Sequence, residues 1–322
     1  MLKTFFRTKR PVTIGSKPWA QQESNTQRRK MVKHRIGVIG LGSMGNGMCQ
    51  SLLRGGFEVF GTDLGVPQRQ AAEAIGVTLV DSIAQLCQQA DVILLSLPTA
   101  QHVKQVIVGD DGILQSAQLS TLVIDTSTSE PDVTRGLAEQ LASQGHALLD
   151  APVSGGPSGA AAGTMVMVIG GKDADLQRAK PFIEALSAKA VHLGPSGSGH
   201  AAKLINNLLC AAHLVTTAEA VALGQKAGLD PAKLLEGLNA GSGRSAVSEV
   251  NFPRWILNNG FDSGFTMQLM RKDVRLAEKL CRDLELELPL SEQVAKIWAA
   301  SEPTIPDQDD FNCIVKTTGL ET

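Results

Sequence analysis

Residues 36–45 read IGVIGLGSMG, and this stretch decides the fold. A short β-rich run leads directly into a GxGxxG string made of Gly40, Leu41, Gly42, Ser43, Met44 and Gly45. A helical stretch follows and ends at residues 54–56. Between a strand and a helix, such glycines allow a tight turn, close approach of the backbone to a pyrophosphate and close helix packing. The string therefore predicts a dinucleotide-binding loop rather than a glycine-rich turn without a ligand.

An acidic residue follows the loop at the spacing expected for a carboxylate that binds ribose hydroxyls. Asp63 lies 18 residues beyond Gly45, at the end of the second predicted strand. A carboxylate there repels the 2′-phosphate of NADP, and neither Leu64 nor Gly65 supplies a compensating arginine. NAD is therefore the favoured cofactor. The preference weakens if Arg69, the nearest downstream cation, folds back.

Short β-rich runs alternate with helical stretches from the first strand onward. The runs cover residues 36–39, 58–60, 92–96, 122–125 and 147–150, and residues 165–169 and 191–193 are expected to add strands. Turn chemistry bounds them, since Asp91 opens a strand and Pro131 restarts a helix. This alternation predicts a parallel sheet of the α/β class.

The pattern changes near Gly194. Residues 199–227 contain no proline and are apolar on almost all sides, which predicts a helix of about 29 residues and roughly 43 Å that crosses a domain junction. Further helices are expected to open at Asp230, Phe265 and Ser291. We therefore expect a sheet domain at residues 34–193 and an all-helical substrate and oligomerisation domain at residues 194–322.

Composition excludes several classes of function. In 322 residues, 30 basic side chains are offset by 32 acidic ones, which leaves no electrostatic footprint for nucleic acid or an anionic membrane. The five cysteines are scattered and form no CxxC pair, which indicates free thiols in a reducing compartment. The six histidines show no metal spacing, so we expect no structural or catalytic zinc.

The first 33 residues are expected to form a flexible basic extension. Residues 1–30 hold eight basic side chains against Glu23 alone. A basic, acid-poor leader is typical of a mitochondrial transit peptide. Residues 10–30 are poorly amphipathic, however, and Met31 stands immediately before the first strand, so an upstream start or an extension explains the segment as well. A cytoplasmic location is expected, with the mitochondrial matrix as the alternative.

Lys203 is the candidate catalytic base. It lies in the string GSGHAAKLINN at residues 197–207, on an otherwise apolar helical stretch, and Asn207 follows one turn later on the same face. Burial disfavours a charged ammonium and lowers its pKa toward the range useful in proton transfer. The alternative for a lone helical lysine is a surface side chain whose ammonium reaches water.

A third string, DAPVSGG at residues 150–156, completes a resemblance. With the glycine loop and GSGHAAKLINN, it resembles the β-hydroxyacid dehydrogenase family, which includes 3-hydroxyisobutyrate dehydrogenase, tartronate semialdehyde reductase and L-threonate dehydrogenase. The resemblance covers residues 35 to roughly 311. It implies a Rossmann-type NAD-binding domain joined by a long helix to an all-α domain, and hydride transfer between a β-hydroxy acid and the nicotinamide.

The resemblance also implies roles for particular residues. Lys203 would exchange the proton of the substrate hydroxyl, and Asn207 would orient both partners. The DAPVSGG loop would bind the substrate carboxylate through Ser154, Gly155 and Gly156, and a hydroxyl beside consecutive backbone N–H groups also suits an anion. The cofactor side would include Leu97, Pro98, Thr128 and Lys272. Without the resemblance, a Lys-Asp pair such as the one at 272–273 is usually a solvated feature.

Alternatives remain within and outside this reaction class. A decarboxylating 6-phosphogluconate dehydrogenase has histidine where Asn206 stands, and imine reductases typically lack the lysine. A non-catalytic NAD-binding sensor of the same fold is the alternative from another class, since sites can be lost from folds. Lys203, Asn207 and Ser154 together argue against it.

The substrate is specified less closely than the reaction. Gly243-Arg244-Ser245 resembles a segment common in the 3-hydroxyisobutyrate branch, but Ala246 and Val247 lack the tryptophan often found there. 3-Hydroxyisobutyrate is therefore slightly favoured as the substrate over tartronate semialdehyde (2-hydroxy-3-oxopropionate), glycerate-type and L-threonate-type compounds. The apolar faces of the long helix predict a homodimer or homotetramer.

Overall fold

The computed structural model describes residues 34–117 and 120–320. The predicted basic extension and the targeting alternative fall on residues 1–33, outside the described residues. The strands are β1 (Arg35–Ile39), β2 (Glu58–Thr62), β3 (Thr78–Leu79), β4 (Val92–Leu95), β5 (Leu122–Asp125), β6 (Ala147–Asp150), β7 (Val153–Ser154), β8 (Met165–Gly170) and β9 (Ser187–Gly194). The two-residue strands β3 and β7 were not predicted.

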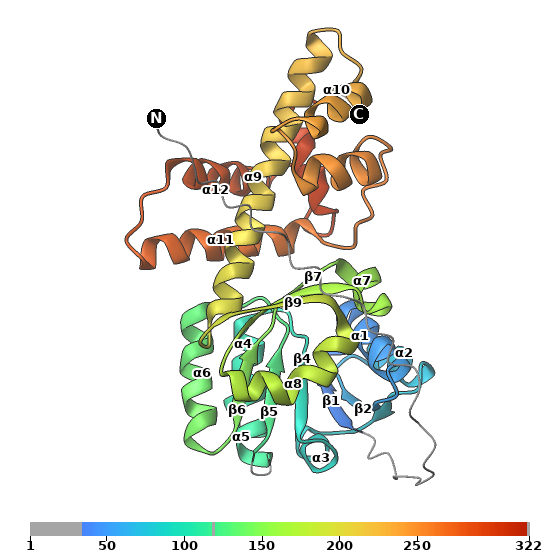
Figure 1. Ribbon diagram of the computed structural model, residues 1–322, viewed down its shortest axis with the longest axis vertical. Coiled ribbons are helices and arrows are strands. Elements are labelled where there is room, and N and C mark those ends of the chain that lie inside the picture. The colour runs from blue at the N-terminus through green and yellow to red at the C-terminus, as the bar shows by residue number, and fades with distance from the viewer. Residues whose placement is uncertain (1–33, 118–119, 321–322) are drawn as a thin grey trace, which may run out of the picture. The chain divides into compact units, whose positions relative to one another are not determined.

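All these strands form one sheet, in the order β3-β2-β1-β4-β5-β6-β8-β7, with β9 paired to β8 (Figure 1). The pairs from β3 to β6 are parallel, whereas β8 runs antiparallel to β6 and β7. The strand order reverses between β1 and β4. At such a switch point the carboxyl ends of the strands border a crevice that binds ligands. The predicted Rossmann-type class is confirmed.

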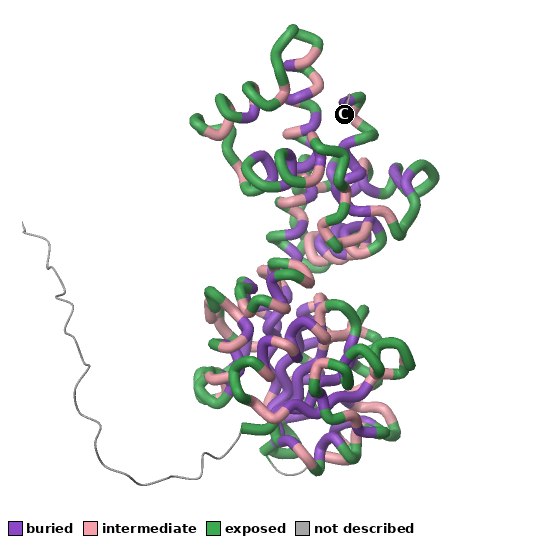
Figure 2. The backbone as a smooth tube through the Cα atoms, turned by 90° about the vertical axis from the view of Figure 1, so that its right-hand side faces the viewer, coloured by how far each residue is buried: buried purple, intermediate pink, exposed green. Residues whose placement is uncertain are grey.

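Helices cover both faces of this sheet. They are α1 (Ser43–Arg54), α2 (Val66–Ala74), α3 (Ile83–Gln89), α4 (Ala100–Val108), α5 (Ile113–Ser116), α6 (Pro131–Ser143), α7 (Gly156–Ala162) and α8 (Asp173–Leu186). Leu94 of β4 packs in a core with α1 and α8, whereas its neighbours Ile93 and Leu95 pack with α4 and α6. Because both faces are covered, the central strands β1, β4, β5 and β6 are almost continuous buried runs. Figure 2 shows the resulting buried interior of this part of the chain.

The rest of the chain is helical, as predicted. It comprises α9 (Ser198–Lys226), α10 (Pro231–Ala240), the π-helix η1 (Val247–Ile256), α11 (Met267–Asp283), α12 (Pro289–Ala300) and the 3₁₀-helix η2 (Phe311–Thr318). The helix α9 has the length and hydropathy of a membrane span. Its residues Ala211, Leu214 and Val221, however, pack with Phe252 and Trp298 in a core, so we interpret it as a core helix.

The first turn of α9 packs directly on the sheet, and this contact predicts a stability effect. A Cβ on Gly199 would lie 2.5 Å from the backbone oxygen of Asp150 and 2.7 Å from that of Val168. We expect Gly199→Ala to lower the free energy of unfolding by about 1–3 kcal/mol, the usual cost of overpacking. Urea denaturation measures it. Gly237→Ala is the control, because its Cβ meets no atom within 4 Å, and equal unfolding free energies for the two variants would contradict the packing.

Candidate active site

The glycine loop has the geometry of a phosphate-binding turn. Gly40 has a φ of +93°, and a Cβ there would lie 2.2 Å from the backbone oxygen of Ser96. A Cβ on Gly45 would lie 1.9 Å from the backbone oxygen of Gly40, whereas one on Gly42 would meet no atom within 4 Å. Gly42 precedes α1 and provides no side-chain cap. Two glycines are thus required by the turn itself, and the third leaves a helix N-terminus open to an anion.

Asp63 is attached to this loop. Its Oδ2 accepts a hydrogen bond from the backbone N–H of Leu41 at 2.6 Å, and its Oδ1 accepts one from Gly65 at 2.7 Å. Each carboxylate oxygen has a second lone pair, so these bonds leave acceptors for ribose hydroxyls. The nearest downstream cation, Arg69, does not approach Asp63, because it donates to Asp81 and to the backbone oxygen of Val80.

Lys203 and Ser154 meet although they lie on α9 and β7. Lys203 is only 9% exposed, and its Nζ donates to Ser154 Oγ at 2.9 Å. Ser154 is followed by Gly155 and Gly156, whose φ values of +129° and +64° suit glycine. The chain turns there from β7 into α7. The structure therefore brings the predicted base and the predicted carboxylate loop together.

Asn207 is held by Asp273, a residue for which no role was predicted. Its Nδ2 donates to Asp273 Oδ2 at 2.6 Å, and its Oδ1 accepts from Asn206 at 3.1 Å. Because a carboxylate only accepts, Asp273 fixes which way the Asn207 amide points. Asp273 is 1% exposed. Its Oδ1 lies 3.1 Å from Lys272 Nζ, at ion-pair distance but without hydrogen-bond geometry.

Lys272 connects this group to the edge of the sheet. Its Nζ donates to the backbone oxygen of Thr128 at 3.2 Å and to that of Pro98 at 3.4 Å. Both acceptors follow carboxyl ends of strands, β5 and β4. The backbone N–H of Leu97 donates to Ser127 Oγ at 3.0 Å, which joins the two strand ends. Four of the predicted cofactor-side residues thus lie close together at the switch point.

The surroundings of Lys203 favour its neutral form. Burial lowers the pKa of the Lys203 ammonium below its ordinary value. The negative charge of Asp273 opposes this shift, and the positive charge of Lys272 reinforces it. A lysine with a lowered pKa and a hydroxyl partner is suited to exchange a proton with a substrate hydroxyl.

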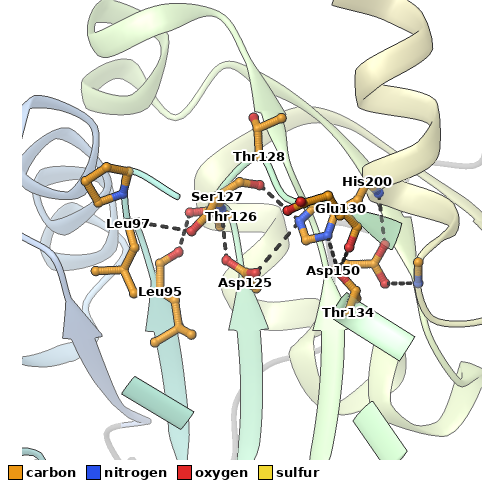
Figure 3. Close-up of polar contacts among 12 residues, drawn as sticks. Leu95, Leu97, Asp125, Thr126, Ser127, Thr128, Glu130, Thr134, Asp150 and His200 are labelled. Carbon is orange, nitrogen blue, oxygen red and sulfur yellow. Dashed lines mark hydrogen bonds and ion pairs between the residues drawn. The ribbon is translucent and has the colours of Figure 1, made fainter. Parts of the chain in front are cut away.

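The sequence did not predict a buried polar cluster at the start of α9, one turn before Lys203. Asp150 Oδ1 and Oδ2 accept the backbone N–H groups of Gly197 and His200 at 2.8 and 3.0 Å, and so cap the start of α9. Figure 3 shows that the His200 ring points toward the turn after β5, with Asp125 beside it. One signal was available in the sequence, since His200 stands three residues before Lys203 on the same apolar helix.

Other nucleophile or metal chemistry finds little support in the part of the chain described here. No group of three His, Cys, Asp or Glu side chains in this part is arranged to hold a metal ion. Burial raises the pKa of Cys49 to about 12 and that of Cys87 and Cys210 to about 11. These thiols are therefore protonated and unreactive at neutral pH.

Comparisons with known proteins agree with this geometry. Residues 35–194 match the family model described as the NAD binding domain of 6-phosphogluconate dehydrogenase. Residues 197–318 match the model described as NAD-binding of NADP-dependent 3-hydroxyisobutyrate dehydrogenase. The two matches together cover most of the chain.

Individual relatives match over nearly their whole length. The chain is 37% identical over 289 residues to 3-hydroxyisobutyrate dehydrogenase of Pseudomonas aeruginosa, covering 87% of this chain and 97% of the relative. It is 33% identical over 282 residues to 2-(hydroxymethyl)glutarate dehydrogenase of Eubacterium barkeri, covering 88% and 94%. The solved structure of Mycobacterium tuberculosis 3-hydroxyisobutyrate dehydrogenase with L-serine superposes with a TM-score of 0.83 at 33% identity, covering 88% and 99%. The chain therefore belongs to the β-hydroxyacid dehydrogenase family, and it is an NAD(P)-dependent oxidoreductase that acts on hydroxyl groups.

Proposed function

We propose that this enzyme oxidises a β-hydroxy acid of the 3-hydroxyisobutyrate type with NAD, and that Lys203 accepts the hydroxyl proton. One observation carries the proposal, namely the 2.9 Å contact between Nζ of the buried Lys203 and Ser154 Oγ. Burying an amine is costly unless it has polar partners. The Ser154 hydroxyl is one partner, and the hydroxyl of a substrate is the second.

Different residues of the site would bind the carboxylate and the hydroxyl of the substrate. Ser154 and the backbone N–H groups of Gly155 and Gly156 would bind the carboxylate. Lys203, neutral at that moment, would take the hydroxyl proton while the carbinol carbon gives up a hydride, and in the reverse direction its ammonium would return the proton. Asn207, oriented by Asp273, would hold the substrate oxygen.

The glycine loop fits a dinucleotide because Gly42 leaves open space at the N-terminus of α1. When bound, NAD supplies the hydride acceptor. Gly40 to Gly45 would hold its pyrophosphate and Asp63 its ribose hydroxyls. The turns at Leu97-Pro98 and Thr128, with Lys272 between them, would border the nicotinamide.

Asp63 is proposed to set the preference for NAD over NADP. Replacing it with asparagine removes the charge that repels a 2′-phosphate but keeps an oxygen to accept the N–H of Leu41. We expect the ratio of kcat/KM for NAD to that for NADP to fall at least about tenfold in Asp63→Asn, which corresponds to about 1.4 kcal/mol. Steady-state kinetics with both cofactors measures this ratio, and an unchanged ratio would exclude Asp63 as the determinant.

The substrates named for the relatives share one chemical unit. 3-Hydroxyisobutyrate, 2-(hydroxymethyl)glutarate and L-serine each carry a hydroxymethyl group and a carboxylate on one carbon. Tartronate semialdehyde gives the same unit when it is reduced. The pairing of Lys203 with the Ser154 loop fits this unit, since one group handles the hydroxyl and the other the carboxylate. The side group on the central carbon is then the variable part.

A panel of hydroxy acids tests the proposal. It comprises 3-hydroxyisobutyrate, L-serine, D-glycerate, 2-(hydroxymethyl)glutarate and L-threonate, each assayed for NAD reduction and ranked by kcat/KM. We expect turnover of the hydroxymethyl acids, with 3-hydroxyisobutyrate first. A protein that binds NAD but reduces none of it with any acid would be a sensor, and the proposed function would be wrong.

We also propose that copies of the chain associate through α9. Three apolar side chains of this helix, Ile205, Leu209 and Leu223, are 59%, 55% and 72% exposed. Exposed apolar side chains on one long helix are typical of an interface between subunits. The molar mass in solution, measured by light scattering, distinguishes a monomer from a dimer or tetramer.

A further inference from the structure

A single imidazole connects the first turn of α9 to the turn after β5. The side chain of His200 is fully buried. Its Nε2 lies 3.0 Å from the backbone oxygen of Ser127, and its Nδ1 lies 2.7 Å from Thr134 Oγ1 in α6 (Figure 3). Because a carbonyl oxygen only accepts, Nε2 carries a proton and donates it to Ser127.

This bridge does not depend on the charge of the ring. Thr134 Oγ1 also lies 3.0 Å from the backbone oxygen of Glu130. Either a neutral ring accepts from the Thr134 hydroxyl, or an imidazolium donates to Thr134, whose hydroxyl then donates to Glu130. Asp125 Oδ2 lies 3.8 Å from Nε2. Nε2 donates to Ser127 in both arrangements.

The two ends of the bridge lead to the two halves of the site. On one side, Thr128 follows Ser127, and its backbone oxygen accepts from Lys272 at 3.2 Å. On the other side, Lys203 follows His200 by three residues, so the two share one helix face. His200 therefore lies between the predicted base and the turn on the cofactor side.

The carboxylate of Asp150 also holds the first turn of α9 in place. It accepts from the backbone N–H of His200 and that of Gly197, so the helix cannot rotate freely at its start. The imidazole thus extends from a fixed point of the backbone. A side chain at position 200 that is shorter than the imidazole, or that donates from another atom, would alter the spacing between α9 and the turn at Ser127.

We propose that His200 is a positioning residue that sets the spacing between Lys203 and the Ser127–Thr128 turn. The inference rests on the proposed function, in which that turn borders the nicotinamide and Lys203 exchanges the proton. Loss of the bridge leaves both binding surfaces in place but lets them shift relative to each other. A misplacement of about 1 Å costs about 10²-fold in rate. The effect is therefore expected in kcat rather than in NAD affinity.

Two polar replacements distinguish the bridge from mere core filling. The amide nitrogen of His200→Gln reaches the position of Nε2 and donates to Ser127. The shorter side chain of His200→Asn reaches only the position of Nδ1, toward Thr134. Both variants keep a polar group in the buried cluster, and in both the Thr134 hydroxyl can donate to the backbone oxygen of Glu130. His213→Gln, elsewhere on α9, is the matched control.

We expect His200→Asn to lower kcat by about 10- to 100-fold. It should also raise the primary deuterium isotope effect on kcat and leave the Kd of NAD nearly unchanged, while His200→Gln keeps most of the turnover and His213→Gln keeps all of it. In the ligand-free wild type, proton NMR should show a slowly exchanging His200 Nε2–H. The inference would be overturned if His200→Gln and His200→Asn had equal turnover, or if the loss of NAD affinity matched the loss of kcat. Absence of the Nε2–H resonance would overturn it as well. A wild type without turnover would instead count against the proposed function.

Discussion

Replacing Lys203 with methionine is expected to lower kcat for oxidation by about 10²–10⁴-fold, the contribution usually made by a positioned acid or base. Methionine keeps the apolar volume of the side chain and removes the amine. The Kd of NAD should not change, because Lys203 contacts Ser154 and not the glycine loop. Steady-state kinetics and titration of NAD binding measure the two quantities.

The same substitution should not harm the fold. Methionine does not bury an amine, so the melting temperature of Lys203→Met is expected to equal or exceed that of the wild type. Lys233→Met, at an exposed position of α10, is the control and should retain full turnover. A loss of kcat smaller than about tenfold in Lys203→Met would be less than the loss expected for a positioned base. Lys203 would then not be the proton acceptor.

The pH profile of oxidation should move in opposite directions when the two charged neighbours of Lys203 are removed. Oxidation needs neutral Lys203, so kcat/KM rises with pH through the pKa of this lysine. The negative charge of Asp273 raises that pKa and the positive charge of Lys272 lowers it. Asp273→Asn should therefore move the ascending limb to lower pH and Lys272→Met should move it to higher pH.

Asp273→Asn is chosen because the amide oxygen that it introduces can still accept from Asn207. The orientation of the Asn207 amide is thereby kept while the charge is lost, and the shift of the limb reports on the charge alone. Shifts of both variants in the same direction would contradict the assignment of the limb to Lys203. A limb that stays in place in both variants would contradict it as well.

Much of the cofactor half of the site was predictable because it is local in sequence. Gly40 to Gly45 and Asp63 follow consecutive strands, and parallel strands place their carboxyl ends at one edge. The long helix was also predictable, within one residue at each end, from its unbroken apolar character. Helical periodicity placed Asn207 on the face of Lys203.

The remaining features depend on tertiary contacts that no local pattern specifies. Asp273 holds Asn207 from a helix 66 residues away in sequence. Asp150 was recognised only as the start of a loop motif, although its carboxylate caps α9. The π-helix η1 contains Pro253 and has the apolar pattern of an ordinary helix, so its wider hydrogen-bond spacing was not predictable from the sequence.

Rescue of Lys203→Ala by added primary amines tests the role of Lys203 most directly. A small amine that enters the space left by the side chain can accept the hydroxyl proton in its place. The account predicts turnover that is near zero without amine, that increases with the concentration of methylamine or ethylamine, and that rises with pH through the pKa of the added amine. Turnover of Lys203→Ala close to that of the wild type, with no dependence on added amine, would contradict it.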